Sequence, residues 1–192
     1  MSEQLSLKRQ DIILSVISAC EGSKKLGRTA LQKLLYFVAI RFGINLGFEP
    51  YYYGPYSSLA ESDVGSLVLG GMVKENRELL GFVGDSGFQA RKYTYTLSDA
   101  GEARLEAVAA AHREPVDRIM EFTKSVISAA NGIDQQVLAA AAKTYFIAHE
   151  RGEPLSVEEI SQHAEKHGWD LRPTQVNRVA EILTRLGLVD VS

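Results

Sequence analysis

The chain has 192 residues, a length that suits one compact domain or two small ones and that can bury a core without metal or disulfide staples. With 45% hydrophobic and 23% charged residues it has a globular composition, and its single cysteine, Cys20, excludes an internal disulfide and any multi-cysteine zinc site. The net charge is −3, with +1 on residues 1–100 and −4 on residues 101–192, so neither half is a strongly basic body that would track a phosphate backbone.

The start of the chain carries no targeting signal. It is polar, no apolar run approaches 18 residues, and no cleavage-site pattern appears. We therefore expect a cytoplasmic protein without a membrane partner.

Two amphipathic helices are predicted before Gly43, which ends the second. The first covers about residues 7–21 and turns Asp11 outward with its basic neighbours, while Thr29 can cap the second. Their apolar faces are formed by Ile12, Ile13, Val16, Ile17 and Cys20 in the first helix and by Leu31, Leu34, Leu35, Val38 and Phe42 in the second.

The next stretch is rich in tyrosine and reads Tyr51-Tyr52-Tyr53-Gly54-Pro55-Tyr56. Proline fixes its own φ and disfavours a helical conformation in the residue before it, so the chain is extended here and then turns. Gly54 is expected to hold a conformation, or a close approach, that a Cβ would obstruct. Ser58 and Glu61 have the spacing of a capping box and predict a third helix over about residues 58–73.

A β-hairpin is predicted after this helix. Leu79 to Val83 can form one strand, Gly84-Asp85-Ser86-Gly87 supplies turn residues, and Lys92 to Leu97 alternates in the manner of a second strand. Three helices followed by a hairpin is the order of a winged helix. We therefore expect a mainly α protein with a small β-hairpin, in which residues 1–98 form an N-terminal winged-helix-like domain.

The remaining chain is predicted to be helical. Residues 99–130 read as linking helices, over about 99–113 and 115–130, that break or kink at Pro115. Residues 131–192 form a C-terminal module with helices over about 134–150, from a Ser156–Glu159 capping box to 166, and over 174–186, with a possible final strand at Gly187–Val191. A short helix, a turn and a longer helix give this module helix-turn-helix character.

Two motifs resemble a known family. They are Thr29-Ala30-Leu31-Gln32-Lys33-Leu34-Leu35-Tyr36-Phe37 and Tyr53-Gly54-Pro55-Tyr56-Ser57, and together they are similar to the Panacea (SocA-like antitoxin) domain and the related YwgA-like proteins. The resemblance covers about a quarter of the chain. It implies a cytoplasmic microbial module that acts through protein contacts, often neutralising a toxin or serving as an adaptor, with no catalytic residues and no cofactor.

The sequence does not favour an enzyme. There is no Gly-rich phosphate loop, no nucleophile elbow and no pair of carboxylates in an apolar setting. His163 and His167 share a helix face, but their order H-A-E-K-H differs from the H-E-x-x-H of zinc proteases, and we expect them to be solvated surface side chains. We predict no metal and no cofactor.

A protein partner is expected at the tyrosine-rich stretch. The rings can either pack onto the second helix or stay exposed, and exposed tyrosines make good protein-binding surfaces because they offer large contact area at low entropic cost. The candidate contact residues are Tyr51, Tyr53, Gly54, Pro55 and Tyr56.

DNA binding is the alternative. The third helix is a poor reader of DNA because residues 57–73 contain no Lys or Arg and include Glu61 and Asp63. The better candidates are Arg91 and Lys92 on the hairpin and Arg172, Gln175, Asn177 and Arg178 in the tail, since Arg, Asn and Gln suit base contacts.

The sequence therefore favours a non-enzymatic regulatory protein that acts through protein–protein contacts, in the manner of an antitoxin or adaptor. The alternative is a winged-helix DNA-binding transcription regulator. A homodimer is compatible with either hypothesis.

Overall fold

The computed structural model of the protein describes residues 7–23, 25–83, 88–152 and 155–189. Eight helices and a small antiparallel sheet are found in this part of the chain, which confirms a mainly helical protein with a hairpin. The elements are α1 (Arg9–Ala19), β1 (Leu26–Gly27), α2 (Arg28–Phe42), α3 (Ser58–Leu69), β2 (Val73–Val83), β3 (Phe88–Leu97), α4 (Asp99–Ala111), α5 (Arg113–Ala129), α6 (Gln135–Arg151), α7 (Val157–Lys166) and α8 (Pro173–Arg185).

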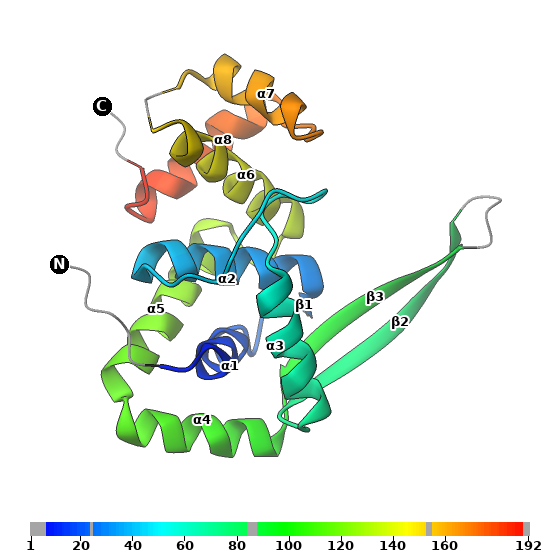
Figure 1. Ribbon diagram of the computed structural model, residues 1–192, viewed down its shortest axis with the longest axis vertical. Coiled ribbons are helices and arrows are strands. Elements are labelled where there is room, and N and C mark those ends of the chain that lie inside the picture. Colours follow the sequence, from blue (N-terminus) through cyan, green and yellow to red (C-terminus); the bar gives the residue numbers. More distant parts are fainter. Residues whose placement is uncertain (1–6, 24, 84–87, 153–154, 190–192) are drawn as a thin grey trace.

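Helices α1 and α2 form the centre of the molecule. Helix α1 packs against α2, α3, α4 and α5, whereas α2 packs against α5 and against α6, which in turn carries α7 and α8 (Figure 1). The buried side chains form one continuous hydrophobic cluster from Ile12 to Leu186. Helix α2 thus connects the N-terminal helices, which pack on it directly, with the last three helices, which pack on it through α6.

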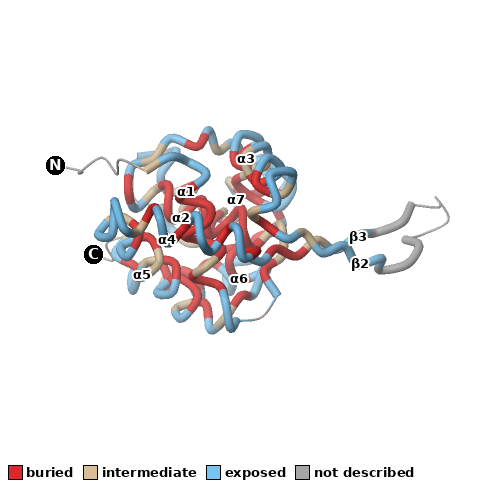
Figure 2. Tube along the Cα trace, turned by 90° about the horizontal axis from the view of Figure 1, so that it is seen from below, coloured by how far each residue is buried: buried red, intermediate tan, exposed pale blue. Residues whose placement is uncertain are grey.

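The hairpin extends away from this helical body (Figure 2). Strand order is β1-β3-β2, and β2 pairs with β3 over almost its whole length, with one irregularity between Leu79 and Gly81. Strand β1 is short and pairs only Leu26 with Tyr95 and Gly27 with Thr94. Both hairpin strands are longer than predicted, and the predicted turn at 84–87 lies outside the described residues.

The starts of two helices differ from the predictions. Helix α2 begins at Arg28 with Gly27 as its N-cap, so a cap at Thr29 is wrong; strand β1 holds the backbone extended up to that point. Helix α3 is capped by Ser57, whose Oγ accepts from the amide of Ala60, so the Ser58–Glu61 capping box is also wrong. Glu61 instead pairs with Arg28 at 3.3 Å.

Asp11 was expected to face solvent but is buried. Its carboxylate accepts hydrogen bonds from Arg104 of α4, at 3.1 Å from Nε and 3.0 Å from Nη2. A buried carboxylate needs such a partner, because an unpaired charge in the interior is costly. The ion pair therefore joins α1 to α4, a contact that helical periodicity does not reveal.

The C-terminal elements follow the predicted order. The break near Pro115 is found at His112, so that Pro115 lies in the first turn of α5, where its missing amide donor costs nothing. The capping box of Ser156 and Glu159 is confirmed at the start of α7. No strand forms over residues 187–189, and the rest of that predicted strand lies outside the described part of the chain.

Three finer assignments stay predictions: the winged-helix class, the helix-turn-helix character of α7 and α8, and the division at residues 98 and 130.

In the parts of the chain that the structure covers, each helix is too short or too polar to cross a membrane.

Two helical glycines provide a test of the packing. A Cβ on Gly101 of α4 would lie 2.1 Å from the carbonyl oxygen of Met72, whereas one on Gly65 of α3 would meet nothing within 4 Å. We expect Gly101→Ala to lower the free energy of unfolding by about 1–3 kcal/mol, as overpacking does. Gly65→Ala should raise it by about 0.5–1 kcal/mol, because alanine is the better helix former. Urea denaturation of both variants measures the contrast, and equal effects would show that α4 does not pack on Met72.

Candidate functional site

The candidate site is built around residues 51–57, which we call the tyrosine strap. The strap is held on α2 by the side chain of Gln32, whose Nε2 donates to the carbonyl of Ser57 and whose Oε1 accepts from the amide of Ser57, both at 3.0 Å. The hydroxyl of Ser57 donates to the carbonyl of Leu46. Tyr56 also pairs with Glu49 through two backbone hydrogen bonds of 2.9 and 2.8 Å. The strap is therefore held by hydrogen bonds to its backbone at Tyr51 and over residues 54–57.

Lys33, the next residue of α2, supports the middle of the strap. Its side chain is 2% exposed, and its Nζ donates to the carbonyl of Pro55 at 2.6 Å. No carboxylate among the described residues forms an ion pair with it. Burial, together with the nearby charge of Lys143, lowers the pKa of Lys33 from 10.5 to about 7.

Gly54 allows the strap to approach the C-terminal helices. Its φ is +97°, and a Cβ there would lie 3.0 Å from Cγ of Lys143, 3.4 Å from Cε of Lys33 and 3.6 Å from the carbonyl oxygen of Ala139. The predicted need for glycine is confirmed on both grounds, backbone conformation and close approach. Gly54 and Pro55 are both buried between α2 and α6, so they support the strap rather than contact a partner.

Trp169, in the loop between α7 and α8, fixes the start of the strap. Its indole Nε1 donates to the carbonyl of Tyr51 at 2.6 Å, and its ring stacks on His167 at 4.7 Å between centroids. His167 is half-buried and also lies 3.3 Å from a carboxylate oxygen of Glu150. His163 is half-buried too, so the expectation that both are solvated surface side chains is wrong. The structure shows no cluster of three or more metal-ligating side chains within the segments it describes.

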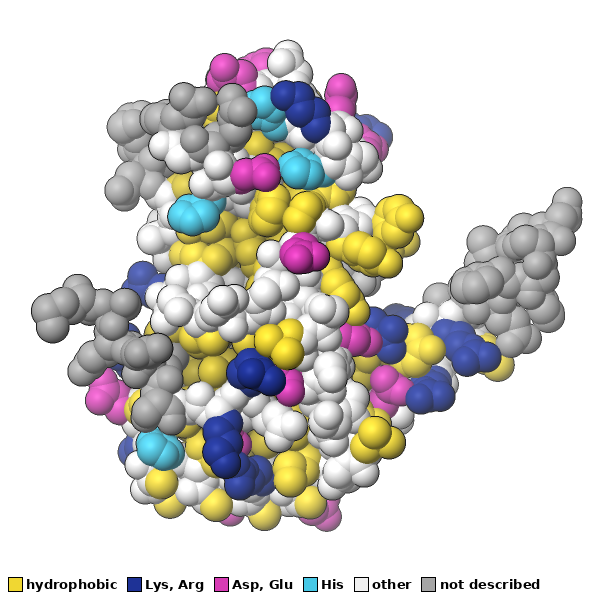
Figure 3. Space-filling view, in the orientation of Figure 1, with side chains coloured by type: hydrophobic (Ala, Val, Ile, Leu, Met, Phe, Trp, Pro, Cys, Tyr) yellow, Lys and Arg dark blue, Asp and Glu magenta, His cyan; other side chains and the backbone are white. Residues whose placement is uncertain are grey.

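The outer face of the strap carries exposed aromatic rings. Tyr51, Tyr52 and Tyr53 are 54%, 77% and 70% exposed, whereas Tyr56 is half-buried. The ring of Tyr51 packs against those of Tyr52 and Tyr56 at 4.9 and 5.1 Å between centroids. Of the two arrangements left open by the sequence, exposure is correct for these three rings. Figure 3 shows a group of hydrophobic side chains that projects from the body above the hairpin, on the side where Figure 1 draws the segment that leads into α3.

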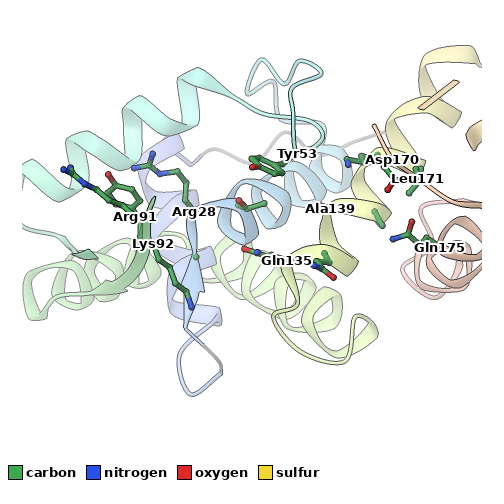
Figure 4. Close-up of a pocket in the computed structure, with 15 residues that line it drawn as sticks. Arg28, Tyr53, Arg91, Lys92, Gln135, Ala139, Asp170, Leu171 and Gln175 are labelled. Carbon is green, nitrogen blue, oxygen red and sulfur yellow. The ribbon is translucent and has the colours of Figure 1, made fainter. Parts of the chain in front are cut away.

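A groove of about 850 Å³ runs beside the strap, from the hairpin to α8 (Figure 4). One end is formed by Arg91 and Lys92 of β3, the other by Asp170, Leu171 and Gln175. Its remaining lining comes from the start of α2, from Tyr53 and Tyr93, and from one face of α6: Gly27, Arg28, Thr29, Gln135, Gln136, Ala139, Ala140 and Lys143.

The groove is cationic. Arg28, Arg91, Lys92 and Lys143 line it, against a single carboxylate, Asp170. Arg28 is already engaged, since it pairs with Glu61 and Glu75 at 3.3 and 3.8 Å and lies over the ring of Tyr93. Burial lowers the pKa of Lys143, and the charge of Asp170 partly offsets this effect. Arg91 and Lys92 are exposed and form no ion pair with the residues that the structure describes.

The tail residues proposed for DNA differ in their surroundings. Arg178 and Asn177 are exposed on α8, whereas Gln175 lines the groove and its Oε1 accepts from the backbone amide of Arg172. The guanidinium of Arg172 lies 3.9 Å from Asp170. The structure thus brings Gln175 together with Tyr53, Arg91 and Lys92, which the sequence had placed in three separate candidate sites.

Four residues of this site were not predicted: Gln32, Lys33, Lys143 and Trp169. The sequence held two usable signals: Lys33 lies within a largely apolar run, and Trp169 is the only tryptophan. Their roles depend on the packing of α6 and of the α7–α8 loop onto the strap.

Comparison with known proteins adds no assignment. No family model matches the chain, and a search of curated proteins found none with significant similarity. The resemblance to the Panacea domain therefore stays a prediction.

Gly54→Ala tests the close approach of the strap to α6, with Gly47→Ala as the matched control. Both glycines have positive φ, +97° and +63°, but a Cβ on Gly47 would meet nothing within 4 Å. We expect Gly54→Ala to lower the free energy of unfolding by about 2–3 kcal/mol and Gly47→Ala by about 1 kcal/mol. Chemical denaturation of the two variants measures the difference, and a larger loss in Gly47→Ala would contradict the packing.

The lowered pKa of Lys33 predicts a pH dependence of stability. Between about pH 7 and 10.5 the unfolded chain holds a proton that the folded protein has lost, so the free energy of unfolding rises with pH in this window. From pH 7 to 9 the gain is about 2 kcal/mol.

Lys33→Met provides the reference for this effect. Cys20, whose pKa burial raises to about 12, acts in the opposite direction above about pH 8.5, but it does so equally in both proteins. The free energy of unfolding of the wild type, minus that of Lys33→Met, should therefore increase from pH 7 to 8 and from pH 8 to 9. A constant difference would show that the Lys33 amine keeps its ordinary pKa.

Proposed function

We propose that this protein is a non-enzymatic regulator that binds another protein through the tyrosine strap, in the manner of an antitoxin or adaptor. The observation that carries the proposal is the exposure of Tyr51, Tyr52 and Tyr53 on a strap that hydrogen bonds hold at Tyr51 and over residues 54–57. Aromatic side chains give the most binding free energy per residue at protein interfaces when they lie on a surface that needs little ordering.

The support beneath the rings favours this function over a purely structural role. Gln32, Lys33 and Trp169 all bond to the backbone of the strap, which leaves the rings of Tyr52 and Tyr53 facing solvent. A strap needed only for stability would bury these rings, because burial of their apolar surface would stabilise the folded protein. The arrangement suits a preformed surface that loses little conformational entropy on binding.

Binding to DNA is the second candidate, and it is favoured by the exposed Asn177 and Arg178 on α8. Reading by α3 is disfavoured, because its charged side chains are two carboxylates, Asp63 and Glu61, which form ion pairs with Arg9 at 2.7 Å and with Arg28. A helix that carries carboxylates and no Lys or Arg is a poor reader of the major groove.

The test uses Tyr52 as a reporter position. A photo-crosslinking amino acid at Tyr52 in the native host should trap a specific protein, which is then identified by mass spectrometry and purified. Tyr52→Ser and Tyr53→Ser should each weaken its binding at least tenfold in calorimetry. Leu69→Ser is the matched control, since Leu69 is 91% exposed and lies at the opposite end of α3 from the strap; it should leave the dissociation constant unchanged.

Two results would contradict the proposal. The first is a trapped protein whose affinity is the same for wild type and both tyrosine variants. The second is nanomolar, sequence-selective DNA binding at physiological salt that Arg178→Ala abolishes, which would favour the transcription regulator.

A further inference from the structure

The groove beside the strap lies against an open edge of the sheet. Strand β1 covers β3 only at Tyr95 and Thr94, where the chain turns into α2. Strand β3 continues back to Phe88, and over residues 88–93 no described strand pairs with it on the side of β1. The backbone N–H and C=O groups that point to this side are therefore available to another extended segment.

The cavity begins where β1 stops. Gly27, Arg91, Lys92 and Tyr93 line the same groove, so its space adjoins the open edge rather than lying elsewhere on the surface. In Figure 4, Arg91 and Lys92 project to different sides of β3, as consecutive residues of a strand do. From there the groove continues past Tyr53 to Asp170 and Gln175, which is the extended shape that a strand-like peptide needs.

The positive charge of the groove favours a negatively charged ligand. Arg91, Lys92 and Lys143 form no ion pair with a carboxylate of the described residues, and Asp170, whose charge acts on Lys143, is the single carboxylate in the lining. Glu78 lies opposite Lys92 in the register of β2 and β3, outside the lining. Carboxylates in a bound peptide would complement these side chains. A nucleic acid strand is less favoured, because it needs a continuous track of cations, whereas Asp170 closes one end and the whole chain has a net charge of −3.

We infer that the groove binds an extended acidic segment of a partner protein, which adds as a strand to the open edge of β3. Main-chain hydrogen bonds to the edge supply affinity. Acidic side chains on the two faces of the added strand reach Arg91 on one side and Lys92 on the other, and a further acidic residue reaches Lys143 along the groove. This inference rests on the proposed function, since it names the part of the partner that binds beside the tyrosines.

Peptide selection on the full-length protein tests the inference. Random 12-residue peptides displayed on phage are selected on the wild type, and we expect the enriched sequences to carry a net negative charge. The double variant Arg91→Glu/Lys92→Glu should bind the selected peptide at least tenfold more weakly. Replacement of the peptide's acidic residues by lysine should restore binding to this variant. Lys124→Glu/Lys166→Glu is the control: it makes the same change in net charge at exposed positions outside the groove lining, and should bind as wild type.

N-methylation of the peptide separates strand addition from other modes of binding. In a strand, only alternate amides donate to the neighbouring edge. Methyl groups on one alternating set should therefore abolish binding, and those on the other set should leave it nearly unchanged. Equal effects of both sets, or selected peptides without acidic residues, would overturn the inference.

Two further experiments distinguish the acidic peptide from other molecules that could occupy the groove. Displacement of the selected peptide by the oligonucleotide dT12, with tighter binding of dT12, would assign the groove to nucleic acid. A dimer in analytical ultracentrifugation that Arg91→Glu/Lys92→Glu dissociates would assign it to a second copy of the chain. Either result would contradict the inference that the groove binds an acidic peptide.

Failure of this inference differs from failure of the proposed function. A partner whose binding depends on Tyr52 and Tyr53, but which binds Arg91→Glu/Lys92→Glu as tightly as wild type, would support the proposed function. The same result would contradict the inference about the groove. Circular dichroism and thermal unfolding of each variant confirm that it is folded.

Discussion

The burial of Lys33 beneath the tyrosine strap is the constraint on which the rest of the structure depends. An amine that is 2% exposed and has no described carboxylate partner is costly to bury, and the cost is reduced by loss of its proton and by its hydrogen bond to Pro55. That bond, with the two made by Gln32, fixes the strap on α2. Gly54 then presents no side chain to α6, which can approach closely.

The same contacts set the position of the C-terminal helices. Helix α6 rests on α2 next to Gly54, and α7 and α8 rest on α6. Trp169 returns from the α7–α8 loop to bond the strap at Tyr51. The exposed tyrosines and the walls of the groove are therefore supported by one set of contacts, and the two proposed binding surfaces share a common base. A partner that used both would meet them in a fixed relative orientation.

Features governed by neighbouring residues were predictable from the sequence. The capping box at Ser156, the helix end at Gly43 and the need for glycine at position 54 each follow from a few adjacent side chains, and all three are confirmed. The cap of α3 was misplaced by one residue because Ser57 and Ser58 are both suitable caps. Only the tertiary hydrogen bonds to Gln32 and Leu46 select Ser57.

The candidate site was less predictable, for a physical reason. Asp11 and Lys33 are charged residues on helices, and a helix pattern places such residues at the surface. Their burial depends on Arg104 in α4 and on the strap, which lie far along the chain. The groove likewise joins β3, α6 and the α7–α8 loop, so the meeting of Tyr53, Arg91, Lys92 and Gln175 follows only from the packing.

Hydrogen exchange of the strap tests most directly whether its aromatic surface is preformed. In the free protein, the amides of Tyr56 and Ser57 are bonded to Glu49 and Gln32, and they should exchange as slowly as amides in the helices. Gln32→Leu should speed their exchange while leaving the amides of α5 protected. Exchange of the wild-type strap at the rate of an unstructured loop would contradict a preformed surface and, with it, the proposed mode of binding.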